Sequence, residues 1–448
     1  MYIKTQKFLV LGVSKSGYAV AKTVLEKGGT CYVYEELKSP KIDRSINELT
    51  ALGAIRVKSA NVDEFLQKTD VLVISPGVPI NHEMAVKAKK LGKRIIGELE
   101  FGVLQFAPVM IAVTGTNGKT TTVTMIDAIL KEQEIKSNLV GNVGIPITAK
   151  VSELESDSVC VAEVSSFQLE SVFSFCPHIS CVLNVAPDHL ERHYTMENYV
   201  FLKKRIFKNQ RESEYCVLNY DDEAVRSFYS EVRAKVVWVS LKERVEGAHR
   251  QDGKLYYNSE FIMNEQDLKL KGEHNVCDAL FAIAAAKLMN VDNERIISAL
   301  KNFKGVKHRI EFICEKNGVA FYNDSKATNT ASTISAIETM RTPTVLILGG
   351  SEKGESYDSL FLKIKESPIK HVVLTGASRY NMLDSAGRSG YANLTVTPDF
   401  KHAVRIANLI SEKGDSVLLS PACASFDSFT GYEERGDAFI KEVESISE

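Results

Sequence analysis

The chain has 448 residues, of which 44% are hydrophobic, and its 55 basic and 57 acidic side chains leave a net charge of −2. This length predicts about three domains, and the balanced charge argues against a polyanion-binding surface, so we expect no nucleic acid partner. The eight cysteines form no C-x-x-C pair and no run of 18 apolar residues occurs. We therefore expect a cytoplasmic protein with reduced thiols, without signal peptide or membrane span.

Short apolar runs alternate with longer amphipathic stretches, a pattern that predicts parallel sheets built from strand–helix–strand units. The expected strands of a first domain, residues 1–97, are 8–11, 31–34, 71–74 and 94–96. A second domain, 98–305, is expected to hold a helix over 120–130, two closing helices over 279–289 and up to Phe303, and strands at 109–113, 159–162, 179–183, 215–218, 254–257 and 268–270. After a linker at 304–309, a third domain, 306–448, is expected to have strands at 319–322, 344–348, 371–374 and 415–419.

The first glycine-rich loop, Leu11-Gly-Val-Ser-Lys-Ser-Gly17, lies between an expected strand and helix. Ser14 occupies the place where a dinucleotide-binding fingerprint has its second glycine, which weakens that interpretation. The loop is either a tight turn or a phosphate site at a helix amino terminus. Because Glu35 and Glu36 follow the next strand, where a carboxylate can bind a ribose, an NAD-dependent oxidoreductase is one hypothesis.

The second loop, Thr114-Gly-Thr-Asn-Gly-Lys-Thr120, joins an apolar strand to a helix and lacks the first glycine of the usual phosphate-loop pattern. Its backbone amides can converge on phosphate, while Lys119 supplies a cation and Thr120 a hydroxyl for Mg²⁺. A purely structural turn is the alternative. The order of strand, loop, Lys-Thr and helix favours phosphoryl chemistry.

Several ordered motifs along the whole chain resemble the Mur ligase family, whose ATP loop has the form G-T-N-G-K-[ST]. These motifs are Ile74-Ser-Pro-Gly-Val-Pro79, Gly141-Asn-Val-Gly144, Ala162-Glu-Val-Ser-Ser-Phe-Gln-Leu-Glu170, Leu183-Asn-Val-Ala-Pro-Asp-His-Leu-Glu-Arg192, Gly272-Glu-His-Asn275, His308-Arg309, Asn323-Asp-Ser-Lys-Ala-Thr-Asn329 and Leu419-Ser-Pro-Ala-Cys-Ala-Ser-Phe-Asp427. The resemblance implies a three-domain α/β fold: a Rossmann-like amino-terminal domain, a central P-loop ATPase-like domain with a mostly parallel sheet, and a Rossmann-like carboxyl-terminal domain.

The motif match is most specific to the ligase of this family that adds D-glutamate to UDP-N-acetylmuramoyl-L-alanine in peptidoglycan synthesis. This activity implies ATP as the phosphoryl donor, an acyl phosphate intermediate, and ADP and phosphate as products. The expected partners are therefore the two small-molecule substrates, and a monomer is the expected state.

The resemblance assigns ATP contacts to one set of residues: Gly115, Thr116, Asn117, Gly118, Lys119, Thr120, Thr121, Asn275, Arg309, Asp324 and Lys326. The last three lie at or beyond the predicted domain junction, so domain closure could complete the site. Asp278 stands where the family often has a second asparagine, and we assign it no nucleotide contact.

Two Mg²⁺ sites are implied, with ligands from Thr120, Glu163, His189 and Lys203. Taken alone, Glu163 reads as a carboxylate at a strand end and His189 as a structural histidine, but both follow apolar strands at the edge where parallel sheets build sites. In the family, a lysine is carbamoylated in the helix that corresponds to residues 196–208, and this lysine follows the position of Tyr199. Alignment assigns this lysine to Lys203, while helical phasing leaves Lys204 open. Lys119, Glu163, His189 and Lys203 are the expected catalytic residues.

The substrate contacts implied by the resemblance are spread over the three domains. They are Ser14, Lys15, Ser16, Ser75, Asn142 and Ser165 for the UDP substrate, and Thr328, Lys353, Ser425 and Tyr432 for D-glutamate. A dicarboxylate needs an ammonium group and several donors to satisfy its oxygens on desolvation. Without the resemblance, Lys353 reads as an ordinary loop lysine.

Three classes of function stay open at this point. They are the amide ligase, the NAD-dependent oxidoreductase, and a nucleotide-binding regulator or phosphotransferase that uses only the central loop. The last leaves the motifs around Asp324 and Ser425 unexplained. Within the ligases, another Mur-type enzyme or a folylpolyglutamate-type enzyme is the nearest alternative, and the latter should lack the Rossmann-like amino-terminal domain.

Overall fold

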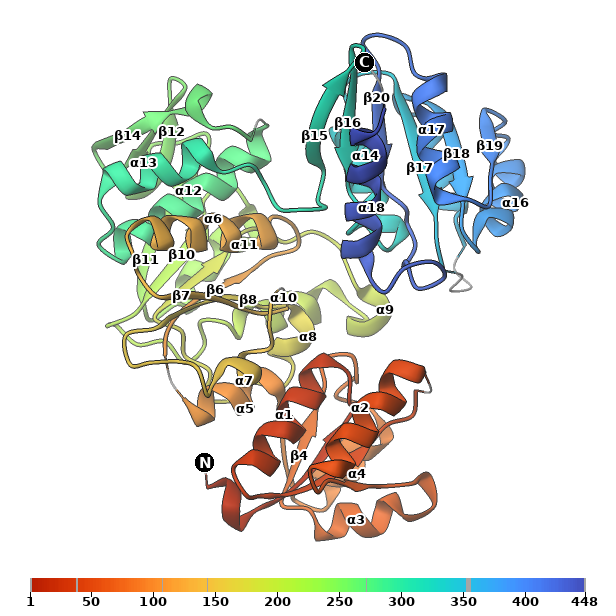
Figure 1. Ribbon diagram of the computed structural model, residues 1–448. Coiled ribbons are helices and arrows are strands. Elements are labelled where there is room, and N and C mark those ends of the chain that lie inside the picture. Colours follow the sequence, from red (N-terminus) through yellow and green to blue (C-terminus); the bar gives the residue numbers. More distant parts are fainter. Residues whose placement is uncertain are drawn as a thin grey trace. The chain divides into compact units, whose positions relative to one another are not determined.

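The structure is a computed structural model that describes residues 2–37, 39–106, 108–142, 144–270, 272–351 and 356–446. It divides into two compact units, Met1–Phe303 and Lys304–Glu448 (Figure 1). The first unit carries two sheets and the second carries one. This confirms the three-part α/β fold, while the domain limits 1–97, 98–305 and 306–448 stay a prediction.

The first sheet has five parallel strands in the order β3-β2-β1-β4-β5. The strands are β1 (Lys7–Leu11), β2 (Thr30–Tyr34), β3 (Ile55–Arg56), β4 (Val71–Ile74) and β5 (Arg94–Gly97). The accompanying helices are α1 (Lys15–Glu26), α2 (Pro40–Ala51), α3 (Val62–Lys68), α4 (Glu83–Lys90) and α5 (Glu98–Gln105). Apolar clusters cover both faces, as a parallel sheet requires.

The second sheet has nine strands in the order β14-β13-β12-β11-β10-β9-β6-β8-β7, parallel except for the antiparallel pairs β12–β13 and β13–β14. The strands are β6 (Val109–Thr114), β7 (Ser137–Gly141), β8 (Val159–Glu163), β9 (Ile179–Val182), β10 (Tyr215–Asn219), β11 (Lys235–Ser240), β12 (Gly247–Gln251), β13 (Lys254–Tyr257) and β14 (Glu260–Asn264). The prediction of a strand at 268–270 is wrong. The edge strand of this sheet is β14, which ends at Asn264, and residues 268–270 form no strand.

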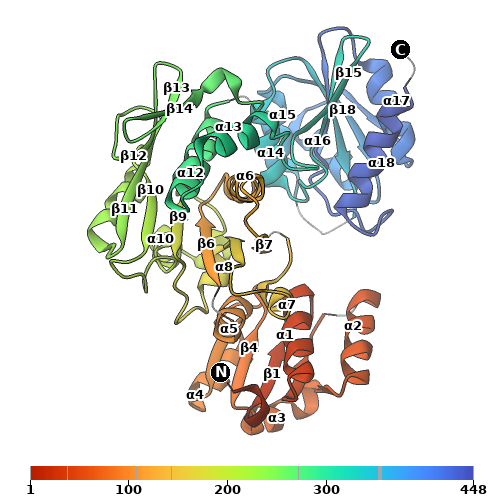
Figure 2. The same ribbon diagram turned by 60° about the vertical axis from the view of Figure 1, so that its left-hand side comes forward.

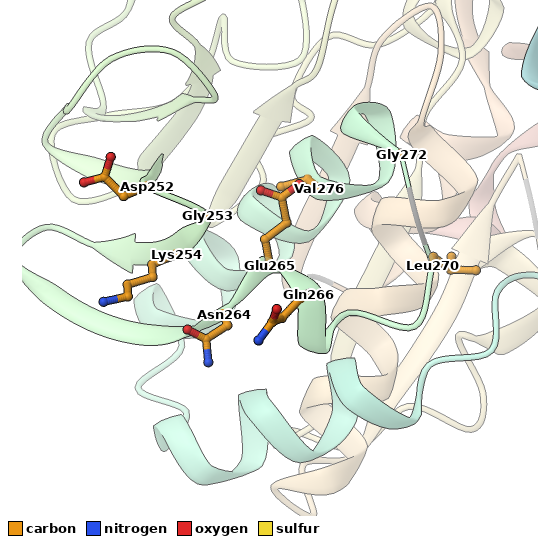
Figure 3. A pocket seen from close by; sticks show the side chains of 9 residues that line it. All are labelled: Asp252, Gly253, Lys254, Asn264, Glu265, Gln266, Leu270, Gly272 and Val276. Carbon is orange, nitrogen blue, oxygen red and sulfur yellow. The ribbon is translucent and has the colours of Figure 1, made fainter.

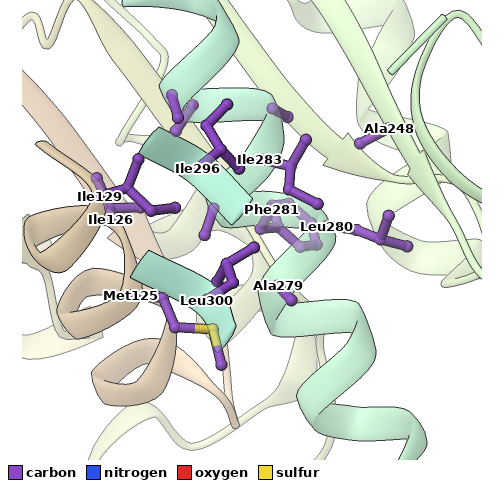
Figure 4. Packing of buried hydrophobic residues seen from close by; sticks show 14 of the residues in the cluster. Met125, Ile126, Ile129, Ala248, Ala279, Leu280, Phe281, Ile283, Ile296 and Leu300 are labelled. Atoms are coloured by element: carbon purple, nitrogen blue, oxygen red, sulfur yellow. The ribbon is translucent and has the colours of Figure 1, made fainter. Parts of the chain in front are cut away.

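Eight helices accompany this sheet in the part of the chain that is described. They are α6 (Lys119–Glu132), α7 (Ile147–Lys150), α8 (Ser166–Leu169), α9 (Leu190–His193), α10 (Met196–Lys204), α11 (Glu223–Ser227), α12 (Glu273–Leu288) and α13 (Asn293–Asn302). Helices α12 and α13 both pack on α6, as Figure 2 shows. Helix α12 is buried almost all round, with Phe281 at the centre of the cluster in Figure 4. Its apolar sequence is what a helix between a sheet and two other helices needs.

The second unit has a six-stranded sheet in the order β15-β16-β20-β17-β18-β19, parallel except for the antiparallel edge pair β15–β16. The strands are β15 (Glu311–Lys316), β16 (Val319–Asn323), β17 (Thr344–Gly349), β18 (Ile369–Thr375), β19 (Leu394–Val396) and β20 (Ser416–Leu419). The helices are α14 (Thr330–Thr339), α15 (Asp358–Lys365), α16 (Arg379–Ser389), α17 (Phe400–Ile410) and α18 (Tyr432–Glu444). Two apolar clusters make up its own core.

Strand β6 lies between β9 and β8. After β6 the chain forms β7 and β8 on one side of this strand, and then β9 and β10 on its other side. In a parallel sheet, such a reversal of strand order leaves a crevice at the carboxyl ends of the strands. The loops after β6, β8 and β9 therefore meet at one edge. Within the described residues, no helix is both long and apolar enough to cross a membrane.

Candidate functional site

The loop after β6 turns at Gly118, whose φ is +83°, a conformation that strains any residue with a Cβ atom. A Cβ at this position would lie 2.3 Å from Oδ1 of Asp278, and the same oxygen accepts a 3.1 Å hydrogen bond from Oγ1 of Thr122. Asp278 thus lies directly against the loop. Sequence reasoning noted Asp278 only as a departure from the family pattern.

Asn184, which follows β9, holds the other side of this loop. Its side-chain oxygen accepts hydrogen bonds from the backbone N–H groups of Thr116 (3.0 Å) and Asn117 (2.8 Å), and its amide donates to the carbonyl of Asn117. The Thr116 hydroxyl also lies 3.2 Å from the hydroxyl of Tyr199. Sequence reasoning quoted Asn184 within a motif but assigned it no role.

The predicted loop residues gather at one point. Nζ of Lys119 donates to the carbonyl oxygens of Gly115 (2.9 Å) and Thr116 (2.7 Å). The Thr120 hydroxyl donates to Oε2 of Glu163 at 2.7 Å, and Thr121 lies in the same first turn of α6. The residue before this helix is Gly118, which has no side chain to cap the first N–H groups, an arrangement typical of anion-binding loops.

Glu163 is 2% exposed at the end of β8, and its second oxygen accepts a 2.7 Å hydrogen bond from the amide of Asn142 after β7. The structure therefore brings Thr120, Glu163 and Asn142 together. Carboxylate and hydroxyl oxygens suit Mg²⁺, which binds through one or two protein ligands and takes the rest from phosphate and water. Within the described residues, no group of three or more histidine, cysteine, aspartate or glutamate side chains is placed to hold a metal ion.

The two candidate lysines of α10 differ sharply in environment. Lys203 is 1% exposed, with Nζ 4.4 Å from the ring centre of Tyr199. Burial, assisted by the charge of Lys119, holds the pKa of Lys203 well below its ordinary value, which favours the neutral amine. Lys204 instead forms an ion pair with Glu231, with 2.5 Å between Nζ and Oε1.

His189 begins the turn of α9 with a φ of 53°, and its Nε2 lies 3.4 Å from Oδ2 of Asp188. Its ring is 4.8 Å from that of Phe167 in α8. Ser165, the residue before α8, receives a hydrogen bond from the backbone N–H of Gln168 and donates to the side-chain oxygen of Gln168. The serine hydroxyl therefore caps its own helix in this structure.

The amino-terminal candidates lie at the start of α1. Ser14 is the residue before this helix, Lys15 and Ser16 form its first turn, and the Ser75 hydroxyl donates to the carbonyl of Gly12 at 2.7 Å. Glu35 accepts a 2.8 Å hydrogen bond from the backbone N–H of Val13. The carboxylate that was considered for a ribose therefore accepts a hydrogen bond from the glycine-rich loop itself.

Asn275 lies in the first turn of α12, beside an open pocket of about 470 Å³ between β13, β14 and that helix (Figure 3). None of the described residues that line this pocket was a predicted site residue. They are Asp252, Gly253, Lys254, Asn264, Glu265, Gln266, Leu270, Gly272 and Val276.

In the second unit, Asp324 is buried at the end of β16. It accepts hydrogen bonds from the Ser420 hydroxyl (2.7 Å) and the backbone N–H of Ile310 (3.2 Å). Burial raises its pKa to about 7, against the opposing charges of Arg309 and Lys326. The structure thus brings these three predicted residues into one electrostatic cluster.

The predicted amino-acid pocket is described in part. The carbonyl of Tyr432 accepts from the Ser325 hydroxyl, and Ser425 is buried with a hydroxyl that makes no hydrogen bond within the described residues. Thr328 lies in the loop before α14, and Lys353 lies outside the described residues. Arg435, which sequence reasoning missed, is buried and donates to Ser325 and to the carbonyl of Ala424.

Three family models match the chain along its length. They are "Mur ligase MurD-like, N-terminal domain" over residues 6–97, "Mur ligase middle domain" over 113–286, and "Mur ligase, glutamate ligase domain" over 308–423.

Curated relatives match over almost their full length. The UDP-N-acetylmuramoylalanine–D-glutamate ligase of Caldanaerobacter subterraneus is 40% identical, with 99% of each chain covered. The enzyme of the same name from Clostridioides difficile is 38% identical, with 100% of each chain covered.

Solved structures share the fold at lower identity. UDP-N-acetylmuramate–alanine ligase of Thermotoga maritima matches with a TM-score of 0.59 and 19% identity, covering 98% of this chain and 99% of that one. MurF ligase of the same organism, solved in complex with ADP, matches with a TM-score of 0.56 and 16% identity over 99% of both chains. By its full-length relatives and its three domain models, this chain belongs to the Mur ligase family.

Proposed function

We propose that the protein is an ATP-dependent amide ligase that joins D-glutamate to UDP-N-acetylmuramoyl-L-alanine during cytoplasmic synthesis of peptidoglycan precursors. The observation that carries this proposal is the 40% identity, over 99% of both chains, to a ligase named for that reaction. The glutamate ligase domain model over 308–423 and the amino-terminal parallel sheet support it.

The reaction has two steps. The alanyl carboxylate attacks the γ-phosphorus of ATP, which forms an acyl phosphate and releases ADP. The D-glutamate amine then attacks the acyl carbon, the C–O bond to phosphate breaks, and the amine loses a proton. Both steps crowd anionic groups together, so the site must supply positive charge and fixed donors.

The loop after β6 has the groups for the first step. Lys119 can leave the carbonyls of Gly115 and Thr116 to neutralise the transferring phosphoryl group. Thr120 and Glu163 would hold Mg²⁺, which when bound neutralises phosphate charge. Asn142 donates to Glu163 and is assigned to the muramoyl substrate.

We assign a second Mg²⁺ ligand to a carbamate on Lys203, together with His189. A neutral lysine amine adds to the carbon of CO₂ and loses one proton, which leaves an anionic oxygen donor. The burial of Lys203 supports this, because the amine that reacts must be unprotonated. Lys204, paired with Glu231, lacks that environment.

The remaining predicted residues keep their proposed roles. Asn275, Arg309, Asp324 and Lys326 are assigned to ATP. Ser14, Lys15, Ser16, Ser75 and Ser165 are assigned to the UDP substrate, and Thr328, Lys353, Ser425 and Tyr432 to D-glutamate.

Phosphate release tests the reaction directly. Purified protein with ATP and Mg²⁺ should release phosphate only when both UDP-N-acetylmuramoyl-L-alanine and D-glutamate are present. Omission of either substrate is the control. Equal turnover with L-glutamate or meso-diaminopimelate would reject the substrate assignment.

The carbamate has its own test. Lys203→Ala should lose at least about 100-fold in kcat, a loss typical of an essential active-site group, and short-chain carboxylic acids should restore part of it. Lys204→Ala, in the adjacent position, is the matched control and should keep near-normal turnover. If Lys204→Ala is the variant that acids rescue, the assignment is wrong by one residue.

A further inference from the structure

Arg192 connects the loop after β4 to the segment after α8 through one guanidinium group. Its Nε and one Nη donate to the two carboxylate oxygens of Glu170, at 3.0 and 2.6 Å. Its Nη atoms also donate to the backbone carbonyls of Gly77 and Val78, both at 3.1 Å. We call these contacts the Arg192 bridge. It occupies four acceptors in a geometry that a single ammonium group cannot reproduce.

The bridge is shielded from water at its Glu170 end, whereas Gly77 at the other end is exposed. The side chains of Arg192 and Glu170 are 13% and 6% exposed. The guanidinium carbon lies 4.5 Å from the ring centre of Phe167, and the rings of His189 and His193 also neighbour that ring, with centres at 4.8 and 5.3 Å. A desolvated pair of this kind holds its partners more firmly than a surface ion pair.

Each end of the bridge reaches a segment with an assigned role. On one side, Gly77 and Val78 belong to the loop after β4, which begins at Ser75. On the other side, the backbone N–H of Arg192 donates to the carbonyl of His189 at 3.0 Å, so the arginine belongs to the same turn. Glu170 follows α8, which Ser165 caps.

We propose that Arg192 is a positioning residue that sets the spacing between the loop at Ser75–Val78 and the turn at His189. This rests on the proposed function, in which the first segment holds the UDP part of the substrate and His189 of the second is a Mg²⁺ ligand. Misplacement by about 1 Å can lower a rate about 100-fold without loss of binding.

Arg192→Lys is the sharpest variant, because it keeps a charge for Glu170 and removes the donors to the two carbonyls. Its kcat should fall about 10- to 100-fold, while KM for ATP changes less than about twofold and the melting temperature stays near that of the wild type. Glu170→Gln keeps the arginine but removes the negative charge that pairs with it. This variant should also lower kcat with little change in KM for ATP, by a smaller factor. Arg226→Lys is the matched control, since Arg226 is exposed and its guanidinium contacts the ring and the carbonyl of Tyr220.

Hydrogen exchange tests the bridge apart from turnover. In Arg192→Lys, amides of both the 75–78 and 189–193 segments should exchange faster, whereas Arg226→Lys should leave them unchanged. Unchanged exchange and unchanged kcat would overturn the inference, and so would a loss that only follows the fraction of unfolded protein. If the wild type turns over no D-glutamate, the proposed function fails, and the exchange result still decides whether the bridge couples the two segments.

Discussion

Gly118 is fixed by two independent constraints, its left-handed backbone and the carboxylate of Asp278. Gly118→Ala should therefore cost about 1–2 kcal/mol for the conformation, plus a displacement of Asp278. We expect ATP-dependent turnover to fall at least tenfold, because the loop amides move with the backbone. Steady-state kinetics and thermal melting measure the two effects.

Gly92 is the matched control for this prediction. It has a φ of +67°, and beyond its chain neighbours no atom of the described residues lies within 4 Å of its hypothetical Cβ. Gly92→Ala should show a similar conformational cost of about 1 kcal/mol and no change in kcat. Equal turnover of the two variants would contradict a special role for the loop at Gly118.

Asp324 makes the stability of the second unit depend on pH. Its folded pKa of about 7 lies above its unfolded value of about 3.8, so folding favours the protonated form. The free energy of unfolding should fall as pH rises from about 4 to 7 and then level off. The side chain introduced in Asp324→Asn cannot ionise, so this fall is absent in the variant. Without nucleotide, the free energy of unfolding of the variant should therefore rise by roughly 2–4 kcal/mol relative to that of the wild type between about pH 4 and 7.

Denaturant unfolding of both proteins between pH 4 and 8 measures this difference. Ser420 can accept a hydrogen bond from the new amide, so the hydrogen bond is kept. Parallel stability curves for the two proteins would show that Asp324 ionises normally in the folded chain.

At the scale of the element, helix α12 contributes most to the core of the nine-stranded sheet. Phe281→Ala should destabilise the first unit by about 3–5 kcal/mol, because the cavity is enclosed by α6 and α13 and cannot collapse. Denaturant unfolding measures the change. Phe261→Ala, on the half-exposed β14, is the control and should cost less than about 1 kcal/mol.

Elements with a strong local pattern were predictable from sequence. The all-apolar run at Val71–Ile74 is a buried parallel strand as expected, since a strand covered on both faces has no other composition. The run at 268–270 failed because alternation in three residues does not distinguish a strand from the turn that follows β14. The edge strands β3 and β19 were missed for the same reason, being short and mostly exposed or half-buried.

The candidate site was predicted where a motif marks it. Lys119 and Thr120 were predicted from the order of strand, loop, Lys-Thr and helix, and Glu163 from the family resemblance; the structure places Thr120 against Glu163. Asn184 and Arg192 contact backbone amides or carbonyls of segments far away in the chain, and Asp278 contacts the Thr122 hydroxyl across a similar separation. No spacing in the sequence encodes those partners, so only the folded structure reveals them.

At the scale of the whole molecule, each unit has its own apolar core. Calorimetry should therefore show a calorimetric enthalpy larger than the van't Hoff enthalpy, the mark of unfolding in more than one step. Phe281→Ala should shift only the transition of the first unit. A single transition, shifted as a whole by this variant, would show that the units unfold together.

The contacts of Lys119 with the carbonyls of Gly115 and Thr116 have a consequence for nucleotide affinity. Under the role proposed for Lys119, phosphate binding is an exchange of partners, because the ammonium must first leave these two carbonyls. The observed affinity for ATP is then the intrinsic affinity multiplied by the fraction of molecules in which the ammonium has left. The proposal therefore makes the strength of two hydrogen bonds within the loop a determinant of ATP affinity.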